Sequence, residues 1–454
     1  MNAKHLLAAA TAVLAVAATH AADIYVSLDT GKNKNAGTKE APLKNLWKAL
    51  ENANDGDTIH LAEGVYPGKM KQNWFLVDKA VSILGGYAKD FAERKPLAHK
   101  TMFQALNENN DKKGTGLGVF TIDFTKRQGN HPQNVDMKFD GLIFDEGFAN
   151  SYHETKGKPE GFDTGMWLEG PAWNKTRDKF PSANRYLVYS ATANRATGKL
   201  TFTNCAFVNS GNIAFNVNWY QGEVDVENCV FCNNRMIGVN VLASKAVPME
   251  GPSRTRPGWK PEVKWTFKNN TVLFTWSRLN DLADMGFGVR SNTGVEAEIC
   301  DNVIGLNVLT GFDNTKGVPA TKRTTLDGNV FFLNRESDVQ MTVSPSIAKV
   351  RVDDFEDLEG TDGIESIEDN EDLKDPSVFK GRLNAQYLNA FLSMKYSEST
   401  KLDEGKCNGL RSVLGLPLQG TITTQCDMFC NRYPLEDALK LFGALDGKGA
   451  QALD

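Results

Sequence analysis

The feature that most constrains the fold of this chain is a short pattern that returns after 24 residues. Residues 202–210 read FTNCAFVNS, and residues 226–234 read VENCVFCNN. Both segments place an Asn and a Cys before an apolar residue and an aromatic residue, with a second Asn two residues further on. Self-similarity with a period of 20 to 50 residues is typical of solenoids, in which each repeat forms one coil stacked on the next.

Further segments align on the first Asn of this pattern. The aligned positions are Asp140, Asn204, Asn228, Asn270, Asn302 and Asn329. From Asn204 onward the spacings are 24, 42, 32 and 27 residues, which indicates a coil of fixed size enlarged by loops of variable length. Because Asn tolerates the left-handed conformation of a tight bend and can bond the Asn stacked above it, we expect an Asn ladder at one bend.

Each repeat alternates apolar and polar residues with period 2, which indicates strands. A coil of 24 residues accommodates three short strands and their bends, so the pattern predicts an all-β, right-handed parallel β-helix over residues 22–350. Long loop insertions are expected at 148–198 and 243–262. Residues 351–454 leave the repeat and are expected to form an acidic, partly helical C-terminal cap.

The N-terminal segment 24–68 combines a strand, a Gly-Thr-x-x-x-Pro loop, a helix, a Gly-Asp-Thr-Ile strand start and a Gly-x-Tyr-Pro turn. With the coils, these motifs resemble the secreted members of the pectate-lyase-like superfamily of right-handed parallel β-helix proteins. The resemblance covers most of the chain. It implies that the helix, with its apolar face of Leu43, Leu46, Trp47, Leu50 and Ala53, covers the open end of the solenoid.

The first 21 residues have the pattern of a secretory signal peptide. Lys4 and His5 precede an apolar run, and Thr19-His20-Ala21 suits cleavage before Ala22. We therefore expect a secreted or periplasmic protein. The net charge of −5 without a basic stripe disfavours nucleic acid as a partner, and no apolar run is long enough for a membrane span.

The acidic stretch 353–375 has two interpretations, a solvated loop or a calcium site. Its spacing does not fit an EF-hand, because the Gly falls at the wrong place. Residues 434–444 form an amphipathic pattern with Pro434 at its start, which predicts a short helix.

The chain contains seven Cys, so an odd thiol is left over from any internal pairing. Cys205 and Cys229 are expected to stack inside adjacent coils as buried thiols. One disulfide is expected among Cys407, Cys426 and Cys430, with its connectivity open. No His follows His153, which excludes a His-based triad or His-ligated metal from the later part of the chain.

The candidate site lies on the strand that follows each Asn unit. Alignment on the inward residue of this strand predicts an outward column of Asn216, Asn240, Arg290 and Asp313. A second outward column is predicted to contain Asn218, Leu242, Asn292 and Thr315. Such a patch of amide and charged groups suits a sugar or acidic-sugar site; the alternative is a solvated outer surface.

Aromatic residues cluster near this column. Apolar ring faces stack on the C–H surfaces of sugars, so these side chains are candidate substrate contacts; the alternative is that they anchor loops on the solenoid. The candidates are Trp167, Trp219, Tyr220 and Trp259.

The resemblance implies a function on polysaccharides. In a lyase of this kind, calcium or a basic side chain neutralises the uronate carboxylate, and a base then removes the acidified ring proton. Arg290 is the candidate base and Asp313 the residue that tunes it or ligates calcium. The catalytic motifs of polygalacturonases, pectin methylesterases and pectate lyases are absent from the sequence. A non-catalytic surface, adhesive or matrix protein is therefore the alternative, and a tailspike-like module is disfavoured by the signal peptide.

Overall fold

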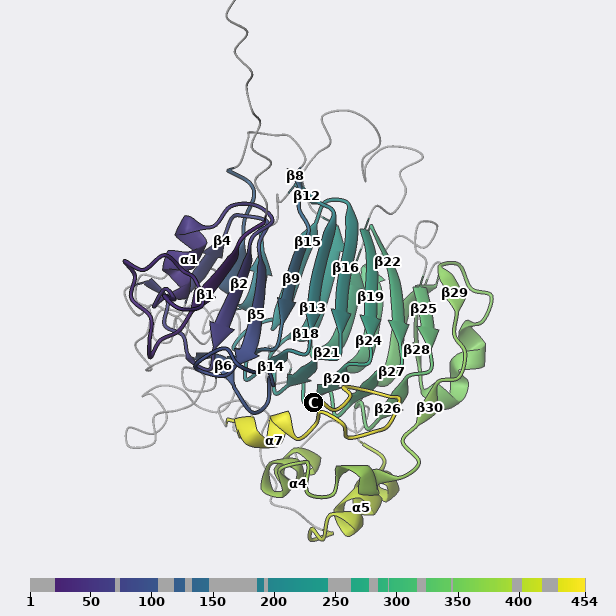
Figure 1. The fold of residues 1–454 in the computed structure, drawn as a ribbon. Coiled ribbons are helices and arrows are strands. Elements are labelled where there is room, and N and C mark those ends of the chain that lie inside the picture. The colour runs from purple at the N-terminus through teal and green to yellow at the C-terminus, as the bar shows by residue number, and fades with distance from the viewer. Residues whose placement is uncertain are drawn as a thin grey trace, which may run out of the picture.

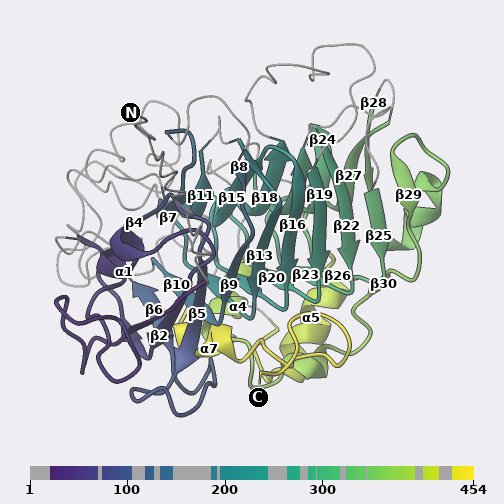
Figure 2. The same cartoon turned by 45° about the horizontal axis from the view of Figure 1, so that its top comes forward.

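A computed structural model of the chain describes residues 21–69, 74–104, 118–126, 133–146, 186–191, 195–243, 263–276, 285–292, 294–316, 324–343, 346–393, 402–418 and 432–453. Within this part of the chain, three long sheets run side by side along one axis (Figures 1 and 2). Successive strands of a coil enter different sheets, and every pairing within the sheets is parallel except the last one in the third sheet. The chain forms the predicted right-handed parallel β-helix.

The three sheets are named A, B and C. Sheet A contains β1 (Asp23–Val26), β2 (Thr58–Ala62), β5 (Ser82–Tyr87), β9 (Met137–Asp140), β13 (Lys199–Thr203), β16 (Gly222–Glu227), β19 (Val263–Lys268), β22 (Val295–Cys300), β25 (Thr324–Asp327) and β29 (Ile364–Ser366). Sheet B contains β3 (Gly64–Val65), β6 (Thr101–Gln104), β10 (Leu142–Asp145), β14 (Ala206–Val208), β17 (Val230–Cys232), β20 (Thr271–Leu273), β23 (Val303–Gly305), β26 (Val330–Phe332) and β30 (Glu371–Asp372).

Sheet C contains β4 (Phe75–Val77), β7 (Gly118–Ile122), β11 (Tyr186–Ser190), β15 (Phe215–Trp219), β18 (Ile237–Ala243), β21 (Phe287–Asn292), β24 (Thr310–Lys316), β27 (Ser337–Val343) and β28 (Ser346–Val350). A two-stranded ribbon pairs β8 (Gln133–Asn134) with β12 (Ala196–Thr197). The helices are α1 (Leu46–Asn52), η4 (Val352–Leu358), η5 (Pro376–Phe379), α4 (Ala385–Leu392), α5 (Glu404–Val413) and α7 (Leu435–Leu439).

The interior is built from stacks of identical positions in successive coils. Phe144, Phe207 and Phe231 stack in sheet B with ring centroids 5.2 and 4.6 Å apart, close to the distance of about 4.8 Å between neighbouring strands. Cys205 and Cys229 are buried free thiols in the same core. The strand alternation read from the sequence thus corresponds to inward and outward side chains.

The Asn alignment is right for the two 24-residue repeats and one residue off in the other coils. In the coil before them, the register places Asp140 beside Thr203, so Gly141 and not Asp140 lies beside Asn204. Strand pairing places Asn269, not Asn270, beside Asn228, and the left-handed backbone falls on this column. Its members are Gly141, Asn204, Asn228, Asn269, Asp301, Gly328 and Asp369, with φ from 52° to 69°. The error arose because this bend requires only a residue that accepts positive φ, so Asn, Asp and Gly replace one another there.

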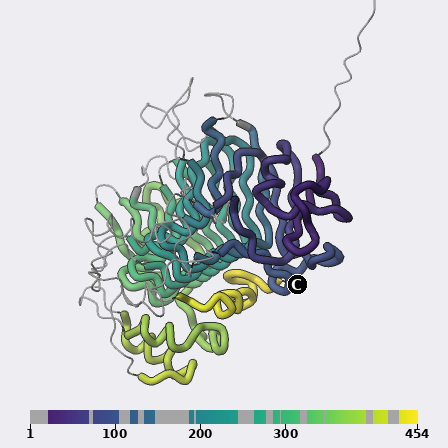
Figure 3. The backbone as a smooth tube through the Cα atoms, turned by 90° about the vertical axis from the view of Figure 1, so that its left-hand side faces the viewer, coloured from purple at the N-terminus to yellow at the C-terminus, as the bar shows by residue number. Residues whose placement is uncertain are grey.

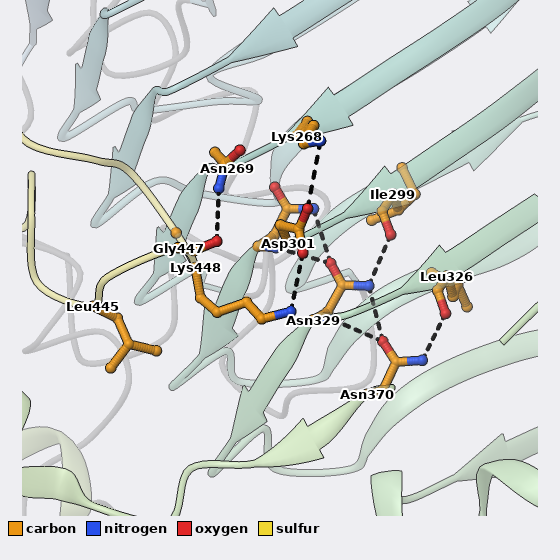
Figure 4. A network of polar contacts seen from close by, with 12 residues as sticks. Lys268, Asn269, Ile299, Asp301, Leu326, Asn329, Asn370, Leu445, Gly447 and Lys448 are labelled. Carbon is orange, nitrogen blue, oxygen red and sulfur yellow. Dashed lines mark hydrogen bonds and ion pairs between the residues drawn. The ribbon is translucent and has the colours of Figure 1, made fainter. Parts of the chain in front are cut away.

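In the left-handed column, Asn228 Nδ2 donates to Asn204 Oδ1 at 2.7 Å, as the two 24-residue repeats predicted. A longer, buried Asn ladder lies in the neighbouring column, which begins with Cys205 and Cys229. The Nδ2 of Asn302 donates to Oδ1 of Asn329 at 2.9 Å. Asn329 donates in turn to Asn370 at 2.9 Å (Figure 4). Asn270 donates to Asn302 at 3.2 Å. A second ladder, which the repeat pattern did not predict, joins Asn307 to Asn334 at 2.8 Å at the bend between sheets B and C.

Two expected boundaries differ from the structure. Strand β11 lies within the expected insertion 148–198 but belongs to sheet C, where it pairs with β7 and β15. The solenoid also continues past residue 350, since β29 and β30 add a further strand to sheets A and B. The signal peptide, apart from Ala21, lies outside the described residues, as does most of both expected insertions.

Only part of the expected C-terminal cap lies at the end of the solenoid. Helices α4 and α7 pack instead along the outer face of sheet B, beneath the strands in Figure 1, with α7 beside β14 and β17. Figure 3 shows the yellow C-terminal segment alongside the solenoid. Phe274 contacts Tyr387, Phe391 and Tyr433 there. The reason is that the outward residues of sheet B, such as Val230 and Leu273, are apolar and require cover.

The ends of the described chain are also tied to the solenoid. Helix α1 lies at the N-terminal end, and its Leu46, Ala49 and Leu50 are part of the core. Near the other terminus, Lys448 pairs with Asp301 at 3.0 Å, and Asn269 donates to the carbonyl of Gly447 at 3.0 Å (Figure 4). No helix among the described residues is long and apolar enough to cross a bilayer.

Candidate functional site

The outer face of sheet C carries a row of polar side chains on neighbouring strands. The strand register places Asn216 of β15 beside Asn240 of β18, Asn240 beside Arg290 of β21, and Arg290 beside Asp313 of β24. We name these four residues the polar row. The alignment on inward residues therefore predicted this column correctly, because the inward apolar residues of neighbouring strands stack in register and so fix which outward residues lie side by side.

The charged end of the polar row is an ion pair that is almost completely buried. Arg290 Nε lies 2.5 Å from Asp313 Oδ2, and the two side chains are 8% and 0% exposed. The N–H of Nε is not aligned for a hydrogen bond with this oxygen. Thr315 donates its hydroxyl to Asp313 Oδ1 at 2.8 Å. Burial raises the pKa of Asp313, while the charge of Arg290 acts in the opposite direction.

Arg290 is held in place by more than its charge partner. Its guanidinium lies over the ring of Phe287, 4.4 Å from the centroid. The two terminal nitrogens have no hydrogen-bond partner among the described residues. A guanidinium fixed in this way presents a donor pair that can bind a carboxylate through two parallel hydrogen bonds.

The amide end of the polar row is connected by side-chain hydrogen bonds. Asn292 Nδ2 donates to Asn240 Oδ1 at 2.6 Å, and Asn240 Nδ2 donates to Asn216 Oδ1 at 2.5 Å. Asn240 thus accepts through its Oδ1 and donates through its Nδ2, so it links Asn292 of the second column to Asn216 of the polar row. The arrangement orients the groups that a bound hydroxyl would meet.

The second predicted column is not continuous. A register irregularity between β21 and β24 pairs Asn292 with Lys316 instead of Thr315. Asn218 has no exposed surface, and its Nδ2 donates to the carbonyl of Ser190 at 3.0 Å. Asn218 therefore connects two coils, and its predicted contact with substrate does not fit this position.

The aromatic candidates have different positions. Trp219 is fully buried in the core, and its Nε1 donates to the carbonyl of Gly198 at 3.1 Å, so it anchors the chain as the alternative interpretation proposed. Tyr220, the next residue, is half-buried. Trp167 and Trp259 lie outside the described residues.

Two further residues of this column were not predicted from the sequence. Tyr189 pairs with Asn216 on one side of the polar row, and Gln340 pairs with Asp313 on the other. Gln340 could have been predicted from the sequence. It follows Asn329 by 11 residues, the same separation as between Asn302 and Asp313. The signal for Tyr189 was hidden by the long sequence gap before it.

The sequence allowed one metal at this site, a calcium ion bound by Asp313. Among the described residues, no group of three or more His, Cys, Asp or Glu side chains is arranged to hold a metal ion. Asp313 is the single carboxylate of the polar row, whereas Ca²⁺ usually takes six to eight oxygen ligands. These residues do not fit a calcium site, and no chemical step is derived from one.

Comparison with known proteins adds little beyond the fold. A family described as proteins of unknown function (DUF1565) matches residues 29–100. No curated protein matches the chain. Among solved structures, a GH136 lacto-N-biosidase from Eubacterium ramulus is similar, with 14% identity and a TM-score of 0.41; the match covers 70% of this chain and 57% of that one.

Two lyases are also similar in structure. A rhamnogalacturonan lyase has 11% identity and a TM-score of 0.30 over 72% of this chain and 77% of its own. The pectate lyase Pel9A has 14% identity and a TM-score of 0.28 over 73% and 79%. At these values, neither the residues nor the activities of these enzymes are transferable. The chain is a right-handed parallel β-helix protein whose N-terminal part matches a family of unknown function.

Proposed function

We propose that this chain is an exported protein that binds or degrades a polysaccharide along the outer face of sheet C. The observation that carries the proposal is the in-register polar row of Asn216, Asn240, Arg290 and Asp313. Neighbouring parallel strands lie about 4.8 Å apart, so the row repeats polar groups along an extended line. Asn216, Asn240 and Arg290 are 7%, 5% and 7% exposed, so a polymer would contact only the outermost atoms of these side chains. An extended polymer with repeated hydroxyl groups suits such a surface.

The charge of the row favours an acidic polysaccharide. Arg290 has its Nε beside Asp313, while its terminal nitrogens lack partners among the described residues. A uronate carboxylate is planar and matches the guanidinium fork, and a charge-assisted hydrogen bond is about twice as strong as a neutral one. Burial of the pair reduces competition from water for this contact.

Lyase chemistry is the finer form of the proposal. Neutralisation of a uronate carboxylate by Arg290 would make the neighbouring ring proton more acidic and so promote elimination. A guanidinium stays protonated at neutral pH, so binding the carboxylate suits Arg290 better than acting as the base. Asp313 has no exposed surface and orients Arg290, which makes it a positioning residue in this proposal.

A non-catalytic scaffold is the second candidate function. It is favoured by the near-complete burial of Arg290 and Asp313, because a pair that neutralises itself can be purely structural. On this reading the stacked coils provide a rigid rod and the polar row is an outer surface of the solenoid.

The test uses the protein from Ala22 with a panel of anionic polysaccharides, with and without calcium. The readout is the ultraviolet absorbance of newly formed unsaturated uronate. A rise that depends on one polymer and is lost in Arg290→Ala, but kept in the distant control Arg382→Ala, supports a lyase. Dextran, an uncharged polymer, is the substrate control.

If no polymer gives a rise in absorbance, the same panel is tested for binding by affinity electrophoresis. Retardation by an anionic polymer that is lost in Arg290→Ala supports a binding protein without lyase activity. Absence of both cleavage and binding contradicts the polysaccharide proposal and favours the scaffold.

A further inference from the structure

A cavity of about 500 Å³ lies at the C-terminal end of the solenoid, between its last coil and helix α5. This volume is within the range of small-molecule sites in proteins, about 300–1,000 Å³. None of the residues that line this cavity belongs to the polar row, so the two sites can be tested separately. Its charged lining residues are Asp338, Arg351, Asp353, Asp372, Asp403 and Lys406.

The walls of this end cavity are fixed by hydrogen bonds that replace the missing next coil. Inside the solenoid, the N–H of Arg335 donates to the carbonyl of Asn307 in the previous coil at 3.0 Å. The corresponding carbonyls of the last coil, Asn334 and Arg335, accept instead from the guanidinium of Arg351, at 2.7 Å for Arg335. Because Arg351 satisfies these carbonyls, the last coil does not require another backbone strand packed against it at this point.

Asp338 places a buried carboxylate in the wall of the end cavity. The residue is 5% exposed, and its Oδ1 accepts from Asn334 Nδ2 at 2.9 Å. Its Oδ2 accepts from the backbone N–H of Val352 at 3.1 Å. The nearest cation is Arg351, whose Nη1 lies 4.0 Å from Oδ1. Both oxygens are thus oriented by neutral donors, and no cation is in direct contact with them among the described residues.

The remaining charges leave the end cavity negative. Lys406 Nζ lies 2.5 Å from Asp372, so these two groups neutralise each other. Asp403 accepts from the backbone N–H of Lys406 at 2.7 Å and begins helix α5. Asp353 is exposed and has no ion-pair partner among the described residues. Four carboxylates face two cations, which gives the lining a net charge of −2.

We infer that the end cavity binds a small polar ligand that carries an ammonium group, of the amino-sugar class. The ammonium would face Asp338 and Asp353, and the carbon body would lie against the apolar lining residues Leu333, Val352 and Leu402. An anion would meet excess carboxylates. A bare metal ion suits the cavity less well, because its volume is large and no metal-ligand group exists among the described residues.

The experiment compares D-glucosamine, D-glucose and D-glucuronate, which share a ring and differ in charge. Saturation-transfer NMR with the protein from Ala22 reports binding of each sugar at the same concentration and ionic strength. We expect a signal for glucosamine that is at least fivefold larger than those of the other two sugars. Asp353→Lys, which supplies its own ammonium at the exposed rim, should abolish the signal, as should Asp338→Asn.

Asp354→Asn is the matched control, because it removes a neighbouring carboxylate that does not line the end cavity. It should leave the glucosamine signal unchanged, and so should Arg290→Ala, whatever the outcome of the polysaccharide assay. Equal signals for glucosamine and glucose, or no signal for glucosamine, would overturn the inference. A glucosamine signal that persists in Asp353→Lys would overturn it as well, without reliance on the buried Asp338 variant.

Discussion

Arg290 Nε and Asp313 Oδ2 lie 2.5 Å apart on adjacent strands of sheet C, with the carboxylate fully buried and the guanidinium nearly so. This pair joins two successive coils, so it contributes to stability in addition to the ligand contact proposed for it. Its two roles can be separated by measuring unfolding apart from binding.

Replacing Arg290 by Met should destabilise the protein by about 3–5 kcal/mol, because it leaves the Asp313 carboxylate buried without its charge partner. The double variant Arg290→Met/Asp313→Leu should recover most of this loss, since no buried charge remains. Equilibrium unfolding in urea at neutral pH measures both. Lys199→Met, which removes a half-exposed partner of Glu223 and Asp225, should change stability by less than about 1 kcal/mol. A double variant as unstable as the single one would refute this account.

Asp338 should make the protein less stable as the pH rises. Burial raises its pKa, against the opposing effects of Asn334 and Arg351, so the folded state binds the proton more tightly than the unfolded state. Its stabilisation is complete below the ordinary value of 3.8 and is lost as the pH passes the raised value. The stability of the protein relative to Asp338→Asn should therefore fall with increasing pH above about 4.

Asp140 provides the comparison of opposite sign for this pH series. Burial acts to raise its pKa, but the hydrogen bond from Thr203 and the charge of Arg94 outweigh it, and the pKa is lowered. Stability relative to Asp140→Asn should therefore fall as the pH decreases. Urea unfolding of the parent protein and of both variants at a series of pH values gives the stability difference between the parent and each variant as a function of pH. Differences that change with pH in the same direction for Asp338→Asn and Asp140→Asn would contradict the opposite pKa shifts.

Asn302→Ala should cost about 3 kcal/mol or more, because it opens the buried Asn ladder. Asn302 donates to Asn329 and to the carbonyl of Phe267, each at 2.9 Å, and accepts from the N–H of Asn270 at 2.8 Å. Each buried group left without a partner costs about 1–3 kcal/mol. Thermal and urea unfolding should both show the loss.

The left-handed column next to this ladder should respond differently. Asp369 is exposed and has a φ of 54°, a conformation that Gly adopts without strain. Asp369→Gly should therefore change the free energy of unfolding by less than about 1 kcal/mol. Asp369→Val should destabilise by about 1–2 kcal/mol, because a β-branched residue is strained there. If Asn302→Ala were as mild as Asp369→Gly, the ladder would not be an important source of stability.

Tyr433→Ala should release the C-terminal helices from sheet B. Tyr433 is 1% exposed, its ring lies 5.0 Å from Tyr387, and its hydroxyl accepts from the N–H of Asn384 at 3.0 Å. We expect a loss of about 3–5 kcal/mol and faster tryptic cleavage after residue 380. Tyr433→Phe, which keeps the ring, should lose only about 1 kcal/mol. Equal cleavage rates for Tyr433→Ala and the parent protein would contradict this docking role.

Buried thiols should resist alkylation in the folded protein. Cys205, Cys229 and Cys232 are fully buried, and burial raises the pKa of Cys229 and Cys232 above the ordinary value. Half-buried Cys300, with its pKa raised by burial to about 11, should react slowly near pH 8 and faster near pH 10. Peptide mass spectrometry after iodoacetamide treatment measures each site. Failure of Cys205 and Cys229 to react in urea without reductant would indicate a disulfide instead of two thiols.

A structural feature could be predicted from the sequence where its signal lies within a single strand or repeat. The inward residues Phe215, Val239, Val289 and Phe312 could be aligned in the sequence, and this alignment alone predicted the polar row. The bend column could not be aligned in the same way, since Asn228, Asn269 and Asp301 satisfy the same backbone requirement with different side chains. The sequence contained a signal for the flanking helices too, because sheet B strands such as residues 230–232 are apolar on both faces, which is typical of strands covered on both sides.

By itself, the sequence determined the solenoid, its strand periodicity and the four residues of the polar row, because these depend on alternation within a strand and on repetition between coils. Tertiary structure decided which of these groups are accessible. It buried Asn218 and Trp219, paired Arg290 with Asp313, and placed Asp338 in the wall of the end cavity. The physical reason is that burial and charge pairing depend on segments far apart in the chain, whose contacts leave no period in the sequence.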